Sequence, residues 1–211
     1  MMENKNFKLL TQIIFYGALW GFIEATLGYA LHWIPTLIAG TIMFPIASTI
    51  LLRAYNKTNS KKALLFIGMV AATIKSLNLF LPSYSVFKTI NPMMSIVLES
   101  LLVFAVVVMF TSEKITNKIA AIQIASIGWR VGYVLFMTAQ FVFTGYVATS
   151  ISSVNNFLGF VVLSGVLSGM FALGFIYIDT VLINKINFKL DTKPVFAAGL
   201  FLLAAVATVI L

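Results

Sequence analysis

The chain of 211 residues contains no cysteine, and only 9% of its residues are charged. The absence of cysteine excludes disulfide bonds, thiolate metal sites and thiol nucleophiles, and it leaves the redox compartment open. A soluble domain carries about 25% charged residues, whereas 61% of this chain is hydrophobic. The composition therefore excludes a soluble globular protein, a disordered chain and a scaffold built on disulfides.

Residues and motifs for catalysis are scarce as well. The chain has six acidic residues and one histidine, and its only aspartates are Asp179 and Asp191. The sequence contains no Walker motif, no H-E-x-x-H zinc motif and no G-x-S-x-G serine motif. An aspartate pair that would hold magnesium and a pyrophosphate is also missing. We therefore expect no catalytic residue, no metal site and no cofactor.

Long apolar runs dominate the sequence. A transmembrane helix needs roughly 20 apolar residues, and seven runs approach that length. They predict an all-α integral membrane protein, a polytopic bundle of six to seven transmembrane helices that forms a single domain over residues 1–211. The last run is the shortest and has no outer anchor. The expected spans cover residues 13–31, 36–54, 63–81, 92–111, 119–142, 155–183 and 194–211.

Proline positions agree with these boundaries. Pro35, Pro92 and Pro194 each stand where a helix would begin, a position that tolerates a missing N–H. Pro82 follows the third run and would end it. Pro45 falls inside the second run and predicts a kink, which a membrane helix accepts when neighbouring groups satisfy the freed carbonyl.

Basic residues alternate between the two sides of the predicted bundle. One side carries only Lys88, and Lys75 and Arg130 lie inside spans. By the positive-inside rule, we expect a multi-pass protein of the inner (cytoplasmic) membrane with its N-terminus in the cytoplasm. The net charge of +8 follows from this rule, so no nucleic-acid partner is expected. The other eleven basic residues share one side: Lys5, Lys8, Arg53, Lys57, Lys61, Lys62, Lys114, Lys118, Lys185, Lys189 and Lys193.

Four charged residues lie deep inside the predicted spans. Counted from the cytoplasmic ends, all four stand about 16–18 Å above that boundary, at about 1.5 Å per residue. Charged residues at this depth are costly, face the bundle interior and pair with other groups. Two acids and two bases would thus share one level near the midplane. These residues are Glu24, Lys75, Glu99 and Arg130.

Further polar residues recur on the same helix faces, at three- or four-residue spacing. On the first, third and fourth helices they run from the charge toward the outer end. This pattern predicts a polar cavity that opens outward, with its floor near the midplane. The residues are Trp20 and His32 beside Glu24, Asn78 beside Lys75, and Asn91 and Ser95 beside Glu99.

The charged layer admits several interpretations. The leading one is a site that binds a small polar or zwitterionic solute for transport. A structural network with Glu24–Arg130 and Lys75–Glu99 pairs is the plainer alternative, and a proton or ion relay is another. An integral-membrane enzyme acting on a membrane lipid or isoprenoid, or an accessory membrane subunit, also stays open.

Small residues on the first helix suggest close helix contacts. The stretches GALWGFIEATLGYALHW (17–33) and KTINPMMSIVLES (88–100) resemble the substrate-binding S component of energy-coupling-factor (ECF) vitamin transporters. The resemblance covers the first six helices, and the seventh span departs from the family's usual six. It implies a transmembrane coupling subunit and two cytoplasmic ATPases as partners, and a vitamin or similar micronutrient as solute. The family's docking positions would correspond to Gly17, Gly21 and Ala25.

The charge alternation generates a prediction about topology. Residues 53–62 and 184–193 should be cytoplasmic and residues 143–154 outside, because basic connections are retained in the cytoplasm. A single cysteine placed at position 57 of this cysteine-free chain should resist an impermeant thiol reagent in intact cells. A cysteine within residues 143–154 should react. Labelling of position 57 in intact cells would show that the true orientation is the opposite of the expected one.

Overall fold

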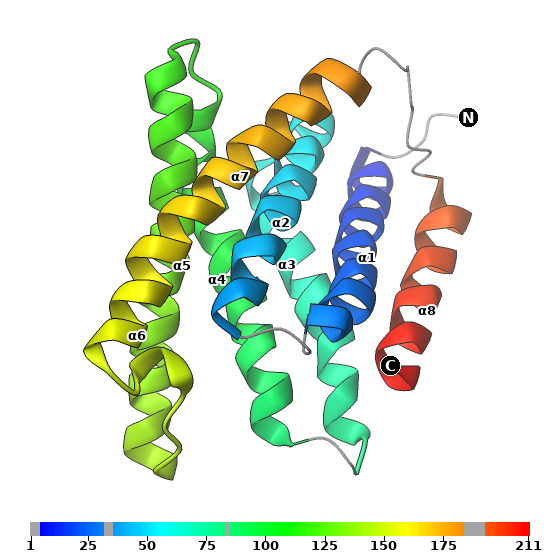
Figure 1. Ribbon diagram of the computed structural model, residues 1–211. Coiled ribbons are helices and arrows are strands. Elements are labelled where there is room, and N and C mark those ends of the chain that lie inside the picture. The colour runs from blue at the N-terminus through cyan, green and yellow to red at the C-terminus, as the bar shows by residue number, and fades with distance from the viewer. Residues whose placement is uncertain (1–4, 32–35, 83–84, 184–192) are drawn as a thin grey trace.

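A computed structural model describes residues 5–31, 36–82, 85–183 and 193–211 of the chain. Every element in these ranges is a helix, so the all-α prediction is confirmed. The helices run up and down in one bundle (Figure 1). Their bounds are α1 Lys5–Leu31, α2 Thr36–Thr58, α3 Lys61–Ser76, η1 Leu77–Phe80, α4 Val86–Phe110, α5 Ile115–Thr144, η2 Thr149–Ile151, α6 Val154–Leu158, η3 Gly159–Leu163, α7 Ser164–Ile178, η4 Asp179–Ile183 and α8 Pro194–Ile210.

Consecutive elements join into longer helical segments that match the seven apolar runs. The turn η1 continues α3, and α6, η3, α7 and η4 follow one another without a break. Both η3 and η4 are single turns of π-helix. Within the described ranges, five segments are long and apolar enough to cross a membrane, which indicates a membrane-embedded protein. They are Lys5–Leu31, Lys61–Phe80, Val86–Phe110, Ile115–Thr144 and Val154–Val181.

The prolines lie largely where the sequence suggested. Pro45 is inside α2 and Pro194 is in the first turn of α8, as predicted. The prediction that Pro92 begins a helix is wrong, because α4 already starts at Val86. Pro92 removes one backbone bond, to the carbonyl of Lys88, an exposed residue in the first turn of the helix, where that loss is small. Pro35 lies outside the described residues.

The order of the helices in space differs from their order in the chain. Helix α1 packs against α3 and α8, while α4 lies between α3 and α5. Helix α7 packs against α2 and α5, and Figure 1 shows it crossing the bundle obliquely in front of them. The buried core gathers around large apolar side chains of α1, α2 and α5, with Trp20, Phe44 and Trp129 among the largest. Helices α1 and α5 lie on different sides of this core and share no extensive contact.

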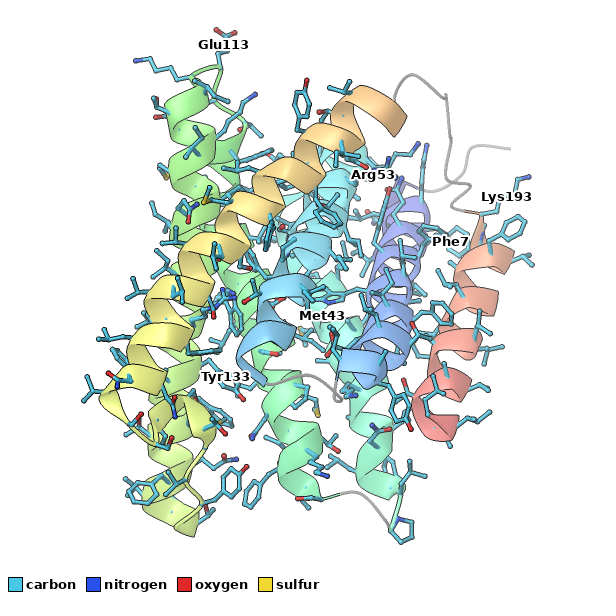
Figure 2. All side chains as sticks on the ribbon, viewed as in Figure 1. Phe7, Met43, Arg53, Glu113, Tyr133 and Lys193 are labelled. Carbon is cyan, nitrogen blue, oxygen red and sulfur yellow. The ribbon has the colours of Figure 1, made fainter. Side chains whose placement is uncertain are left out.

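The basic connections gather at one end of the bundle. Figure 2 shows Arg53, Glu113 and Lys193 toward one end and Tyr133 nearer the opposite end. Arg53 lies in the part of α2 that leads into the α2–α3 connection, Glu113 lies in the α4–α5 connection, and Lys193 immediately precedes α8. The fold thus keeps the alternation on which the expected orientation depends.

Glycines set the close contact between α1 and α3. A Cβ on Gly17 would stand 2.6 Å from Cβ of Val70, and one on Gly21 would stand 2.8 Å from Cδ1 of Ile74. Both pairs advance by four residues, so α1 and α3 run parallel and in register. Ala25, one turn further on, is only 3% exposed. The three positions that the ECF resemblance assigned to partner docking are therefore buried inside this chain.

Small residues of α7 serve a similar purpose. A Cβ on Gly165 would stand 3.0 Å from Cγ1 of Ile127. On the next turn of α7, Gly169 faces the side-chain amide of Gln123. The small face of α7 therefore allows close packing on α5.

This packing yields a prediction about Gly21. We expect Gly21→Leu to destabilise the bundle by about 1–3 kcal/mol, the usual cost of overpacking a filled contact. The matched control is Gly174→Leu on α7, because a Cβ there meets nothing within 4 Å. Melting curves of both variants in detergent provide the measurement. A Gly21→Leu protein as stable as the control would contradict the α1–α3 contact.

Candidate functional site

Arg130 is the most deeply buried of the four intramembrane charges, with an exposed fraction of 0%. Its Nη1 donates to the carbonyl and to the hydroxyl of Ser126, over 2.7 Å and 3.1 Å. Its Nη2 donates to the carbonyl of Gly40 over 3.1 Å. Of the three guanidinium nitrogens, only Nε lacks a hydrogen-bond partner among the described residues. Arg130 is thus bound to backbone carbonyls of α2 and α5.

Aromatic rings and a serine complete this arrangement. The guanidinium carbon stands 4.5 Å from the ring centre of Trp129 and 5.7 Å from that of Phe160, distances typical of cation–π contacts. Phe160 lies on the π-helical turn η3. The hydroxyl of Ser126 donates to the carbonyl of Gly165 on α7 over 2.7 Å. Arg130 and Ser126 together therefore connect α2, α5 and α7.

Helix register explains which charges face each other. On α4 and α5, Leu102 meets Gly128 and Leu98 meets Gly132, which places Glu99 at the height of Arg130. The charges of Glu99 and Arg130 interact accordingly.

On α1 and α3, the parallel register places Glu24 beside the turn that carries Lys75, and these two charges also interact. Glu24 interacts in addition with Glu99, which has the same charge. Glu24 therefore has one attractive and one repulsive neighbour among the four residues.

The expected pairs Glu24–Arg130 and Lys75–Glu99 are therefore wrong. The first pair required α1 and α5 to be neighbours, which they are not. The second fails because Ser100 of α4 faces Gly68 of α3. Glu99 thus stands nearer the height of Gly68 than that of Lys75, roughly 10 Å further along α3 at about 1.5 Å per residue. The predicted single layer is divided between two heights.

Three of the four charges have no direct partner. Lys75 is 7% exposed, Glu99 is 4% exposed and Glu24 is half-buried. In the described part of the chain, none of the three forms an ion pair or a hydrogen bond; Arg53 and Asp179, 2.7 Å apart, form the one ion pair found there. None of the charged atoms of Glu24, Lys75 and Glu99 is among the fully buried atoms without a partner, so water or a solute can reach them.

Two neighbouring polar atoms are also without partners. Oδ1 of Asn78 lies just beyond Lys75 on η1, and Nε1 of Trp20 lies one turn before Glu24 on α1. Both atoms are buried and form no hydrogen bond with any described residue. Together with the three unpaired charges, they provide acceptors and donors that a bound molecule would satisfy.

The remaining predicted site residues are engaged elsewhere. Asn91 accepts a hydrogen bond from Nε2 of Gln140 over 3.1 Å. The hydroxyl of Ser95 donates to the carbonyl of Pro92 over 2.9 Å. His32 lies outside the described residues. Sequence reasoning missed Gln140, although a glutamine inside an apolar run is itself a signal for a polar partner on a facing helix.

Comparison with protein families, curated proteins and solved structures gives no match to this chain. The chemistry of the open residues is therefore the basis for a functional proposal. Carboxylates accept hydrogen bonds, an ammonium group donates them, and an amide oxygen accepts them. Together, these groups can form hydrogen bonds and charge contacts with a polar molecule.

The two kinds of buried cation should respond differently to substitution. We expect Arg130→Lys to cost roughly 3 kcal/mol, because an ammonium group cannot replace bonds to two helices and two ring contacts. Lys75→Gln should cost much less, because Lys75 forms no bond in the described structure. Melting temperatures in detergent compare the two. Equal losses would show that Lys75 is as structural as Arg130.

Proposed function

We propose that this chain is a membrane protein that binds a small polar solute beside α1, α3 and α4 and takes part in its transport. The observation that carries the proposal is a set of three charges that form no hydrogen bond or ion pair with any described residue, namely the buried Lys75 and Glu99 and the half-buried Glu24. Charges inside a membrane protein that are not paired commonly mark substrate or ion pathways. A polar solute would provide the missing partners.

The contrast with Arg130 argues against a purely structural network. In such a network each charge would be matched by a neighbour, because an unmatched buried charge costs several kcal/mol. Arg130 meets this requirement through backbone carbonyls and ring faces. Glu24, Lys75 and Glu99 lie near opposite charges but form no hydrogen bond or ion pair with any described residue, so their donors and acceptors stay available to a ligand.

The direction of access follows from the positions of the polar residues. Asn78 lies further than Lys75 from the end of the bundle with the basic connections, because α3 begins at that end. Asn91 lies further than Glu99 from that end, because α4 finishes there. With the basic end in the cytoplasm of a cell whose inner membrane holds the protein, the site would open outward.

The ECF resemblance would supply the remaining parts of an importer, a coupling subunit and two cytoplasmic ATPases. Because Gly17 and Gly21 pack on α3, such a subunit would contact another face of the bundle. The solute would then be a micronutrient taken up from outside the cell.

A double-mutant cycle on Glu24 and Lys75 tests this proposal. If the pair were structural, each single change would strand its partner, and the double change Glu24→Leu with Lys75→Met would recover stability and activity. For a solute site we expect small stability losses of about 1 kcal/mol in the singles, because water reaches the remaining charge. The double variant should be stable and inactive.

Native mass spectrometry provides the readout for binding. Wild-type protein, purified from cells that take up the solute, should carry a small-molecule adduct that the double variant lacks. If the double variant also carries the adduct, Glu24 and Lys75 are not part of the binding site.

A further inference from the structure

The outer ends of the α3 segment and of α4 bury polar side chains and expose apolar ones. Asn78 is the only buried residue of η1, whereas its neighbours Leu79 and Phe80 are 44% and 82% exposed. On α4, Thr89 is the only buried residue among the described residues 86–95, and its exposed fraction is 0%. In this part of the bundle the polar side chains therefore face the interior.

Both of these side chains have an atom without a partner. Oδ1 of Asn78 and Oγ1 of Thr89 are fully buried, and neither forms a hydrogen bond with any described residue. A threonine in a helix often donates its hydroxyl to the carbonyl four residues earlier, as Thr73 does to that of Met69. Thr89 makes no such bond. Because buried polar atoms are rarely left in this state, both atoms call for a partner from outside these helices.

Helix register brings Asn78 and Thr89 together, and we call them the outer polar pair. The turn η1 packs against α4, and the antiparallel helices α3 and α4 meet where Gly68 faces Ser100. From that contact, Asn78 and Thr89 each lie about 16 Å toward the outer end, at about 1.5 Å per α-helical residue and 2.0 Å per 3-10 residue. Thr89 also stands two turns before Ile96, whose carbonyl lies beside Gly68, so Thr89 is on the face of α4 that packs on α3.

The outer polar pair adjoins two of the open charges of the proposed site. Asn78 follows Lys75 by three residues and lies on the same face of the α3 segment. In the parallel register of α1 and α3, Glu24 lies at the height of Leu77, the residue before Asn78. A Cβ on Gly28 would stand 3.4 Å from Oε1 of Glu24, so this carboxylate extends along α1 toward the outer end.

We infer that the solute carries an uncharged group that both donates and accepts hydrogen bonds, a hydroxyl or a carboxamide, and that Asn78 and Thr89 bind this group. The inference rests on the proposed function, because it names a chemical feature of the solute and two binding residues of the same site. Oδ1 of Asn78 accepts a hydrogen bond, and the hydroxyl of Thr89 both donates and accepts. Neither side chain is charged, so the outer polar pair offers hydrogen bonds without a counter-charge, which fits an uncharged group.

Cysteine labelling tests whether the outer polar pair faces a site that small molecules enter. Thr89→Cys and Ile96→Cys place thiols on one face of α4 in a chain without cysteine, and the two native residues are 0% and 2% exposed. Each full-length variant is treated in detergent with 2-hydroxyethyl methanethiosulfonate, which is uncharged and carries a hydroxyl, and the added mass is followed by mass spectrometry. We expect the Thr89→Cys protein to react about tenfold faster, because a thiol packed in a closed core is inert.

Three amino acids of equal chain length compare the groups that the outer polar pair could bind: L-glutamine, L-glutamate and L-norleucine. All three carry one ammonium and one carboxylate group, which match the opposite charges of Glu24 and Lys75. They differ at the far end, which is a carboxamide, a carboxylate or a methyl group. Melting temperatures of the full-length protein are recorded in detergent with each. We expect L-glutamine to produce the largest increase, about 5 °C at saturation, as a ligand of the folded state does.

Thr89→Val tests the hydroxyl itself, because valine has nearly the shape of threonine. Without ligand, this variant should melt at the wild-type temperature or above it, since it removes a buried hydroxyl that has no partner. It should nevertheless bind L-glutamine about tenfold more weakly, the effect of one lost hydrogen bond, and Thr89→Ser should restore binding. The matched control is Thr138→Val on the exposed face of α5, where the hydroxyl donates to the carbonyl of Val134; it should bind as the wild type does.

The contrary results are equally specific. Equal labelling of the two cysteine variants, with L-glutamine binding unchanged in Thr89→Val, would mean that the outer polar pair holds an internal water only. A larger shift with L-glutamate or L-norleucine would overturn the uncharged hydrogen-bonding group and keep a solute site. No shift with any of the three would also overturn the inference, whereas the proposed function fails only if the wild-type protein carries no adduct.

Discussion

The structure depends on one buried guanidinium group that is bound by backbone rather than by an acid. Arg130 donates to carbonyls of α2 and α5, and its neighbour Ser126 extends the connection to α7. The position of α7 across the bundle follows from these bonds and from its small residues.

The division of roles among similar residues follows from this bonding. Arg130 and Lys75 are both cations buried in the bundle, yet one is satisfied by the scaffold and the other is open. Because charges in a medium without water must find partners, a satisfied charge fixes the fold, and under the proposed function an open one would recruit a ligand. The two acids differ less than the two cations do. Glu99 lies near the positive charge of Arg130 but accepts no hydrogen bond from it. Under the proposed function, this mixture of fixed and open groups would allow a rigid bundle to hold a solute.

The sequence predicted where the helices lie in the chain far better than which helices pack against each other. Apolar runs located all seven segments, because each helix must satisfy its own backbone and be apolar over a fixed length. The predicted start of α4 at Pro92 was wrong, because a proline is tolerated beyond the first turn of a helix when it lies near an exposed end. Depth counting singled out four charges, of which Lys75, Glu99 and Arg130 are buried and Glu24 is half-buried, but the pairs were assigned by sign alone. Their true partners depend on which helices are in contact. Arg130 donates to backbone carbonyls, and because every residue has a carbonyl, no sequence pattern identifies such a partner.

The π-helical turn η3 has a consequence for the length of the chain. A π-helical turn is an α-helical turn with one residue inserted, and the flanking helix keeps its phase on both sides. A relative with one residue deleted within Gly159–Leu163 would continue as ordinary α-helix. Gly165 would still face Ile127, and Asp179 would still reach Arg53. A deletion of one residue at this turn therefore leaves both helix faces aligned, whereas a deletion within α7 would rotate one face away from its neighbours.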